Sequence, residues 1–78
     1  MVGNMIYLFY KQDLVRGGIQ LVAPHATFDG AKKRFDEARE YWSEKGKIVY
    51  DDGVSLIVRG EDGTPLYYYF VSTRTIRE

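Results

Sequence analysis

The chain has 78 residues, equal numbers of acidic and basic side chains, and no cysteine. This length corresponds to one domain. Zero formal net charge is atypical of dedicated nucleic-acid-binding proteins, which are usually basic, and of nucleic-acid mimics, which are strongly acidic. The absence of cysteine excludes disulfides, thiolate metal sites and a cysteine nucleophile. Seven Tyr, four Phe and one Trp are a surplus of aromatic residues that the fold or the function has to explain.

Two short strands are predicted before the helix. Residues 4–11 carry apolar side chains on both alternating faces, which is typical of a central strand or of one covered twice. The polar segment that follows ends in Gly17-Gly18 and indicates a hairpin loop. Residues 19–23 form the second strand, and Pro24 is expected to stop it. His25, the one histidine, is then expected in an exposed loop.

Residues 27–46 predict the single helix, around which the rest of the chain is organised. Thr27 is a suitable N-cap, and Gly46 suits the left-handed position after the last turn. Gly30 in the first turn should cost about 1 kcal/mol relative to alanine, so we expect close packing or a close approach there. Burial of each of the three aromatic members of the helix stripe should contribute about 2–3 kcal/mol. At spacings of three and four, the apolar stripe is Phe28, Ala31, Phe35, Ala38 and Trp42.

Three strands follow the helix, at residues 47–51, 54–59 and 66–76. Asp52-Gly53 and Asp62-Gly63 are signals for tight hairpin turns between them. The element order is therefore ββαβββ. It predicts an α+β fold in which an antiparallel sheet of four to five strands carries one amphipathic helix on one face.

The two turns also predict a register. Two-residue turns would place Leu56 opposite both Val49 and Tyr69, and alternation then sorts the side chains onto two faces. The face expected under the helix holds Val49, Val54, Leu56, Val58, Tyr67, Tyr69 and Val71. The second face holds Ile48, Tyr50, Ser55, Ile57, Arg59, Leu66, Tyr68, Phe70, Ser72 and Arg74.

One helix can cover only one of these faces, so the second is expected to be a partly open surface. An exposed apolar patch usually marks an interface, and Tyr and Arg commonly anchor one. The predicted partner-binding residues are Tyr50, Ile57, Arg59, Tyr68, Phe70 and Arg74. Acidic residues at the two hairpin tips suit turns, and they could also touch a basic groove on a partner. These residues are Asp51, Asp52, Glu61 and Asp62.

No motif for catalysis stands out. The chain has no cluster of His or Cys for a metal, no phosphate-binding loop and no nucleophile motif, so we expect a protein that is not an enzyme and needs no cofactor or metal. Its opening residues lack a basic region, and no run approaches ~20 apolar residues, so a cytoplasmic location without membrane contact is expected.

Three functions stay open on this reasoning. The first is a protein-binding or inhibitory protein that uses the aromatic face. The second is a structural or regulatory homodimer that pairs through that face or through an edge strand. The third is a small module for single-stranded nucleic acid, in which Arg59, Arg74 and the tyrosines contact bases and phosphates.

The layout resembles that of small anti-CRISPR proteins and other anti-defence proteins encoded by phages. The likeness lies in a brief first strand, in ATFDGAKKRF opening the helix, and in the hairpin series GKIVYDDGVSLIVRGEDGTPLYYYF. The resemblance implies stoichiometric binding to a host defence complex. It transfers no individual site residue, and the lack of strong acidity distinguishes this chain from the DNA mimics of that class.

Overall fold

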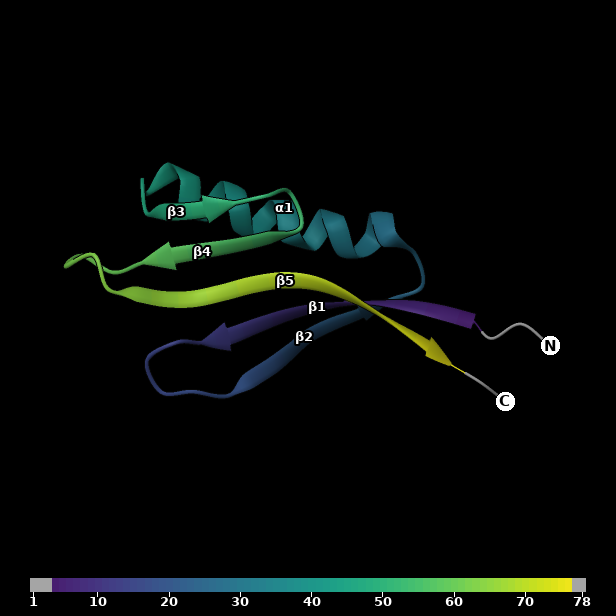
Figure 1. Cartoon of the computed structure of the whole chain (residues 1–78). Helices are drawn as coiled ribbons and strands as arrows, with labels where there is room; N and C mark the ends of the chain where they lie inside the picture. Colours follow the sequence, from purple (N-terminus) through teal and green to yellow (C-terminus); the bar gives the residue numbers. More distant parts are fainter. Residues whose placement is uncertain (1–3, 77–78) are drawn as a thin grey trace.

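The computed structural model of the protein describes residues 4–76. Residues 1–3 and residues 77–78 lie outside this range. The expectation that the chain does not open with a signal peptide concerns residues that lie partly outside it. The predicted order ββαβββ is confirmed, and all five strands form one antiparallel sheet in the order β2-β1-β5-β4-β3 (Figure 1). The elements are β1 (Asn4–Asp13), β2 (Ile19–His25), α1 (Phe28–Glu44), β3 (Ile48–Asp51), β4 (Ser55–Arg59) and β5 (Pro65–Ile76).

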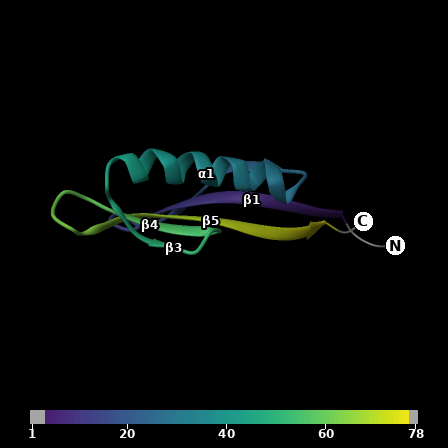
Figure 2. The same ribbon diagram turned by 90° about the horizontal axis from the view of Figure 1, so that it is seen from above.

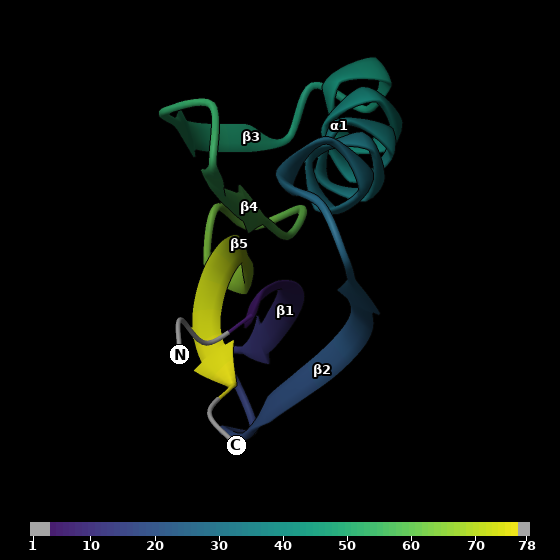
Figure 3. The same cartoon turned by 90° about the vertical axis from the view of Figure 1, so that its right-hand side faces the viewer.

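The molecule has two layers, with α1 on one side of the sheet. Its dimensions of 51 × 24 × 17 Å describe a long, thin body, and 17 Å matches one helix layer on one sheet. Figure 2 shows α1 along one side of the strands and no other described element on the opposite side. Figure 3 shows the twisted sheet from its end, with β3 at one edge and β2 at the other.

The helix begins and ends as its sequence predicts. Thr27 is the N-cap, and its Oγ1 accepts a hydrogen bond of 3.1 Å from the backbone N–H of Gly30. Gly46 follows the helix with φ +67°, in the left-handed region that favours glycine. Gly30 is closely packed, because a Cβ built there would lie 3.1 Å from Nδ1 of His25. This close approach explains why a glycine stands in the first turn.

The core lies between α1 and the sheet. Phe35 is fully buried and meets Phe9 edge to face, with ring centroids 6.4 Å apart. Leu56, Val58 and Tyr69 complete the buried cluster. The prediction that Phe28 is buried was wrong, because this side chain is 40% exposed at the start of the helix, where its ring meets the Tyr7 ring edge to face. The partly buried side chains packed on the cluster are Val22, Ala38, Trp42, Ile48, Tyr67 and Val71.

The predictions for Pro24 and His25 were also wrong. The strand β2 continues through Pro24, which pairs with Leu8, because an edge strand tolerates a proline whose missing N–H would face solvent. His25 belongs to this strand, opposite Tyr7, and it is half-buried. Its Nε2 is buried without a hydrogen-bond partner among the described residues.

The register between β4 and β5 is confirmed, although the turn differs. Leu56 pairs with Tyr69 as predicted. The turn is a three-residue loop, in which the N–H of Gly63 donates to the carbonyl of Gly60 and Gly63 has φ +88°. A bulge at Leu66 then restores the register that a two-residue turn would have produced.

The register between β3 and β4 was predicted wrongly. Asp51 pairs with Leu56, and three residues, 52–54, connect β3 to β4 in place of two. A bulge at Val49 moves Ile48 to the helix side, opposite Val58, and leaves Val49 54% exposed. Val54 lies in the connection and is 40% exposed. The remaining members of the predicted helix-side set, which are Leu56, Val58, Tyr67, Tyr69 and Val71, do pack under α1.

Candidate functional site: the open face of the sheet

The side of the sheet opposite α1, here called the open face, is built by three pairs of neighbouring strands. On β5, Phe70 pairs with Tyr10 of β1 and with Ser55 of β4. Tyr68 is the neighbouring residue of β5 on the same face, and it pairs with Ile57 of β4. Cross-strand partners share a face, so their side chains form continuous rows. The open face comprises Ile6, Leu8, Tyr10, Gln12, Tyr50, Ser55, Ile57, Tyr68, Phe70, Ser72 and Arg74, of which Leu8 and Ser55 are buried.

Three aromatic rings stack along the middle of the open face. The ring of Phe70 lies 5.1 Å from that of Tyr10 and 4.9 Å from that of Tyr68, with interplanar angles of 23° and 25°. All three side chains are half-exposed. The stack holds the rings in one orientation, so a partner would meet a preformed apolar surface that loses little conformational freedom on binding.

A hollow of about 390 Å³ lies beside this stack. Leu14, which is 39% exposed, reaches it from the β1–β2 loop, where its backbone N–H donates to the carbonyl of Leu66. Tyr50 forms another wall and is 47% exposed. The hollow is lined by Leu14, Tyr50, Asp52, Ser55, Ile57 and Tyr68. Its volume is large enough for one large side chain of a partner and lies at the small end of the range of ligand pockets.

A charged group sits at the rim of the hollow and is held by the fold. Oδ1 of Asp52 accepts from the backbone N–H groups of Val54 and Ser55 at 3.0 and 2.7 Å, and Oδ2 accepts from the Tyr50 hydroxyl at 2.9 Å. The N–H of Val54 is the largest cause that lowers the pKa of Asp52 to about 2. The same carboxylate raises the pKa of Tyr50. Asp52 therefore orients Tyr50 and carries a permanent negative charge at neutral pH.

Acid is expected to remove the stabilisation that Asp52 provides. Its pKa in the fold lies below the ordinary value of 3.8, so the contribution is present above about pH 4 and is lost as the pH falls toward 2. We expect Asp52→Asn to be less stable than the parent at pH 7, and to approach the parent at pH 2. Urea unfolding at the two pH values measures this difference. Glu40→Gln on α1 is the control, and a difference for Asp52→Asn that stayed constant with pH would contradict the assignment.

The structure brings together four of the six predicted partner-binding residues. Tyr50, Ile57, Tyr68 and Phe70 lie on the open face next to one another. Arg74 lies on the same face but at the far end of β5, opposite Ile6.

Arg59, the sixth residue, serves the fold. Its guanidinium donates to the carbonyls of Gly60 at 2.9 Å and Gly46 at 3.1 Å. It therefore ties the β4–β5 turn to the segment after α1. A side chain held in this way is less available to a partner than an unbonded surface arginine.

The acidic tips do not form one surface, because their turns lie at opposite ends of β4 (Figure 1). Asp51 forms an ion pair with Arg39, with 2.9 Å between Oδ2 and Nε. At the other tip, Glu61 pairs with Lys47, and Asp62 accepts from the backbone N–H of its turn. These carboxylates stabilise turns and link neighbouring elements.

Sequence reasoning missed the part of the open face that β1 supplies, in which Tyr10 stacks on Phe70, and it missed Leu14 at the neighbouring hollow. The alternation of residues 4–11 does place Tyr10 on one side of its strand. Its position beside Phe70 depends on the pairing of β1 with β5, which are distant in the sequence and share no turn. Leu14 stands with Val15 in an otherwise polar loop, where two adjacent apolar residues give no periodic signal.

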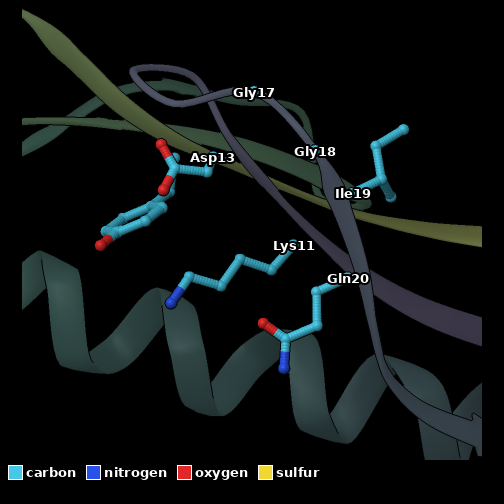
Figure 4. A pocket seen from close by; sticks show the side chains of 7 residues that line it. Lys11, Asp13, Gly17, Gly18, Ile19 and Gln20 are labelled. Carbon is cyan, nitrogen blue, oxygen red and sulfur yellow. The ribbon is translucent and has the colours of Figure 1, made fainter.

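A second hollow, of about 320 Å³, lies on the helix side of the sheet (Figure 4). The ammonium of Lys11 lies 4.1 Å from the ring centroid of Tyr67, in a cation–π contact. The carboxylate of Asp13 lies on the other wall, and the backbone N–H groups of Arg16 and Val15 lower its pKa. Lys11 and Asp13 carry opposite charges, and each already has a contact within the protein. This hollow is therefore a weaker candidate for a binding site than the open face.

Between residues 4 and 76, no three His, Asp or Glu side chains gather closely enough to hold a metal ion. No helix in the described part of the chain combines the length and the apolar character needed to cross a membrane. Comparison with known proteins found no matching family model, no matching curated protein and no matching solved structure.

Proposed function

We propose that this chain is a binding protein that captures a protein partner on the open face of its sheet and carries out no catalysis. The observation that supports this most strongly is the stacked row Tyr10–Phe70–Tyr68, which stays half-exposed because the one helix packs on the other side. The hollow beside the row supplies a pocket for an anchoring side chain. Preformed aromatic surface with an adjoining pocket is the usual composition of a protein–protein hot spot.

The charge of the open face favours a protein over a nucleic acid as the partner. Within the described residues, strand alternation places two cationic side chains on this face, Arg59 and Arg74, and Arg74 lies at the far end of β5. Arg59 is held by two backbone carbonyls. Nucleic-acid binding depends largely on contacts between cations and phosphates and weakens steeply with salt. Binding to single-stranded RNA or DNA at low salt that disappears at high salt would support that alternative.

Capture of a partner from a bacterial extract tests the proposal. We expect the Tyr68→Ala/Phe70→Ala variant to lose at least about 30-fold in affinity, the effect of removing a hot spot. Its melting temperature should fall by only a few degrees, because both side chains are half-exposed. Val15→Ala is the control, since Val15 is a 64% exposed apolar residue outside the face. Capture that survives in the double variant would reject the open face as the site, and so would unfolding of that variant.

The narrower form of the proposal makes the partner a bacterial CRISPR surveillance complex, and it places the protein in the host cytoplasm. It rests on the resemblance in layout to anti-CRISPR proteins. Expression of the chain in a bacterium with an active CRISPR system should then restore phage plaques, and the double variant should not. Plaques that stay suppressed across the CRISPR types tested would reject this partner, while the capture experiment would still test protein binding.

A further inference from the structure

The outer edge of β2 carries a short segment with unpaired backbone groups. Within this strand, which forms one end of the sheet, Ile19 is 60% exposed and Leu21 is 45% exposed (Figure 3). Segment 19–23, which reads IQLVA, contains no charged residue and no proline. Natural edge strands are usually blunted by lysine, proline, a bulge or shortness, because an unprotected edge recruits another strand.

The two edges of the sheet differ in this respect. At the other edge, β3 has four residues and a bulge at Val49, so it offers little regular backbone. On β2, the bulge at Val22 and the proline at position 24 protect only the end of the strand that leads into the helix. Residues 19–21 are left as a regular, uncharged stretch.

The direction of the free groups follows from the ladder between β1 and β2. The N–H of Asp13 donates to the carbonyl of Gly18 at 3.1 Å, so this pair is hydrogen-bonded. Antiparallel ladders alternate between bonded and non-bonded pairs. The next pairs are Gln12 with Ile19, Lys11 with Gln20, and Tyr10 with Leu21. The N–H and C=O of Gln20 therefore face β1, and those of Ile19 and Leu21 point away from the sheet.

We infer that β2 pairs antiparallel with β2 of a second copy of this chain, about a two-fold axis at Gln20, to make one continuous ten-stranded sheet. Ile19 of each copy then lies opposite Leu21 of the other, and the two pairs together form four backbone hydrogen bonds. In this register Ile19 and Leu21, whose N–H and C=O groups point away from their own sheet, lie opposite each other across the axis.

The side chains are compatible with this register. Figure 4 shows Gln20 beside Lys11 on the helix side, with Ile19 directed to the opposite side of the strand. The two Gln20 amides would meet across the axis and can hydrogen-bond to each other. Ile19 and Leu21 of the two copies would form an apolar row that joins both open faces. Arg16 of one copy would lie opposite Pro24 of the other, so no like charges are opposed.

A second copy fits this edge better than an unrelated peptide. The pairing segment has no charge that would select an acidic or basic strand. It is also self-complementary about the axis, which is the requirement for an isologous dimer. The inference stands apart from the proposed function, because the dimer uses the edge of the sheet and leaves Tyr68 and Phe70 accessible.

Concentration-dependent hydrogen exchange, combined with sedimentation, tests this pairing without any substitution. Between micromolar and millimolar concentration we expect a monomer–dimer equilibrium. The amides of Ile19 and Leu21 should exchange slowly in the concentrated sample and rapidly in the dilute one. The amide of Gln20, which faces β1, should be slow in both and serves as the internal control. A monomer throughout the range would overturn the inference, and so would a dimer whose Ile19 and Leu21 amides stay rapid.

Two variants at one position separate the backbone from the side chain. Leu21→Pro removes an N–H that the monomer does not use, so the fold should survive and the dimer dissociation constant should rise at least about tenfold. Leu21→Ala keeps the N–H and should weaken the dimer less. Tyr68→Ala/Phe70→Ala should leave dimerisation unchanged, which distinguishes this edge from the open face. A dimer that persists in folded Leu21→Pro would overturn the pairing, and if that variant does not fold, the exchange experiment decides.

Discussion

Replacing Phe35 with alanine is expected to lower the free energy of unfolding by about 3–5 kcal/mol. Phe35 is fully buried at the centre of the helix stripe, and its ring meets Phe9 edge to face. A domain of this size has a net stability of about 4–12 kcal/mol, so the loss would remove much of it. Urea unfolding monitored by the signal of the one tryptophan measures the change.

Phe28→Ala is the matched control, because it makes the same substitution in the same helix, at its first residue. Phe28 is 40% exposed and touches the Tyr7 ring at 6.0 Å between centroids. Its loss should cost about 1 kcal/mol. Equal losses for the two phenylalanines would show that α1 is buried along its whole stripe, and would contradict the helix placement described above.

Tyr69→Ala is expected to destabilise the protein far more than Tyr68→Ala, although the two tyrosines are adjacent on β5. Tyr69 is 8% exposed, stacks on Phe9 with centroids 5.9 Å apart, and accepts a hydrogen bond of 3.1 Å from Nε1 of Trp42. Removing it leaves a cavity and an unpaired indole N–H, at a cost of about 3–4 kcal/mol. Tyr68 lies half-exposed on the open face, so its loss should cost about 1 kcal/mol.

This pair of variants measures the asymmetry of the sheet directly. Both changes remove the same atoms from the same strand, so any intrinsic loss of strand propensity is shared. Equilibrium unfolding should separate them by about 2 kcal/mol or more. Similar costs would mean that both faces of the sheet are buried, and the open face would then be unavailable to a partner.

The local parts of the fold could be predicted from the sequence. The spacing of the helix stripe, the Thr27 cap and Gly46 all act within a few residues of one another, and the helix with both of its ends is confirmed, Phe28 of the stripe excepted. The register of β4 with β5 was also predicted, because a short turn joins the two strands. In these cases the chemistry that decides the structure is contiguous in the chain.

The predictions that failed depended on contacts between distant segments or on an inserted residue. The Asp52-Gly53 signal predicted a two-residue turn between β3 and β4. Asp52 instead accepts three hydrogen bonds, which hold a longer connection between these strands. The bulge at Val49 then moved Ile48 to the other face. Nothing in the sequence sets the pairing of β1 with β5, so the place of Tyr10 beside Phe70 was not predictable. The exposure of Phe28 depends on how closely the first turn of α1 approaches the sheet, which periodicity does not report.

Four of the six predicted site residues still came together, because a two-residue error in register preserves the faces. The predicted register paired Tyr50 with a β4 residue two positions away from Ile57, its actual partner. Because side chains alternate with a period of two, Tyr50 stayed on the predicted side of the sheet. The two arginines were placed by alternation alone. Alternation does not show that the Arg59 guanidinium has backbone acceptors within reach.

Site-specific photo-crosslinking tests the central claim, that the open face is where this protein meets its partner. A photo-reactive phenylalanine analogue is placed at position 68 on the open face, or at position 33 on the exposed side of α1, and the protein is irradiated in the extract used for capture. We predict a discrete heavier product from position 68 and none from position 33. A discrete product from position 33 alone, or a product from position 68 that contains only a second copy of this chain, would contradict the claim.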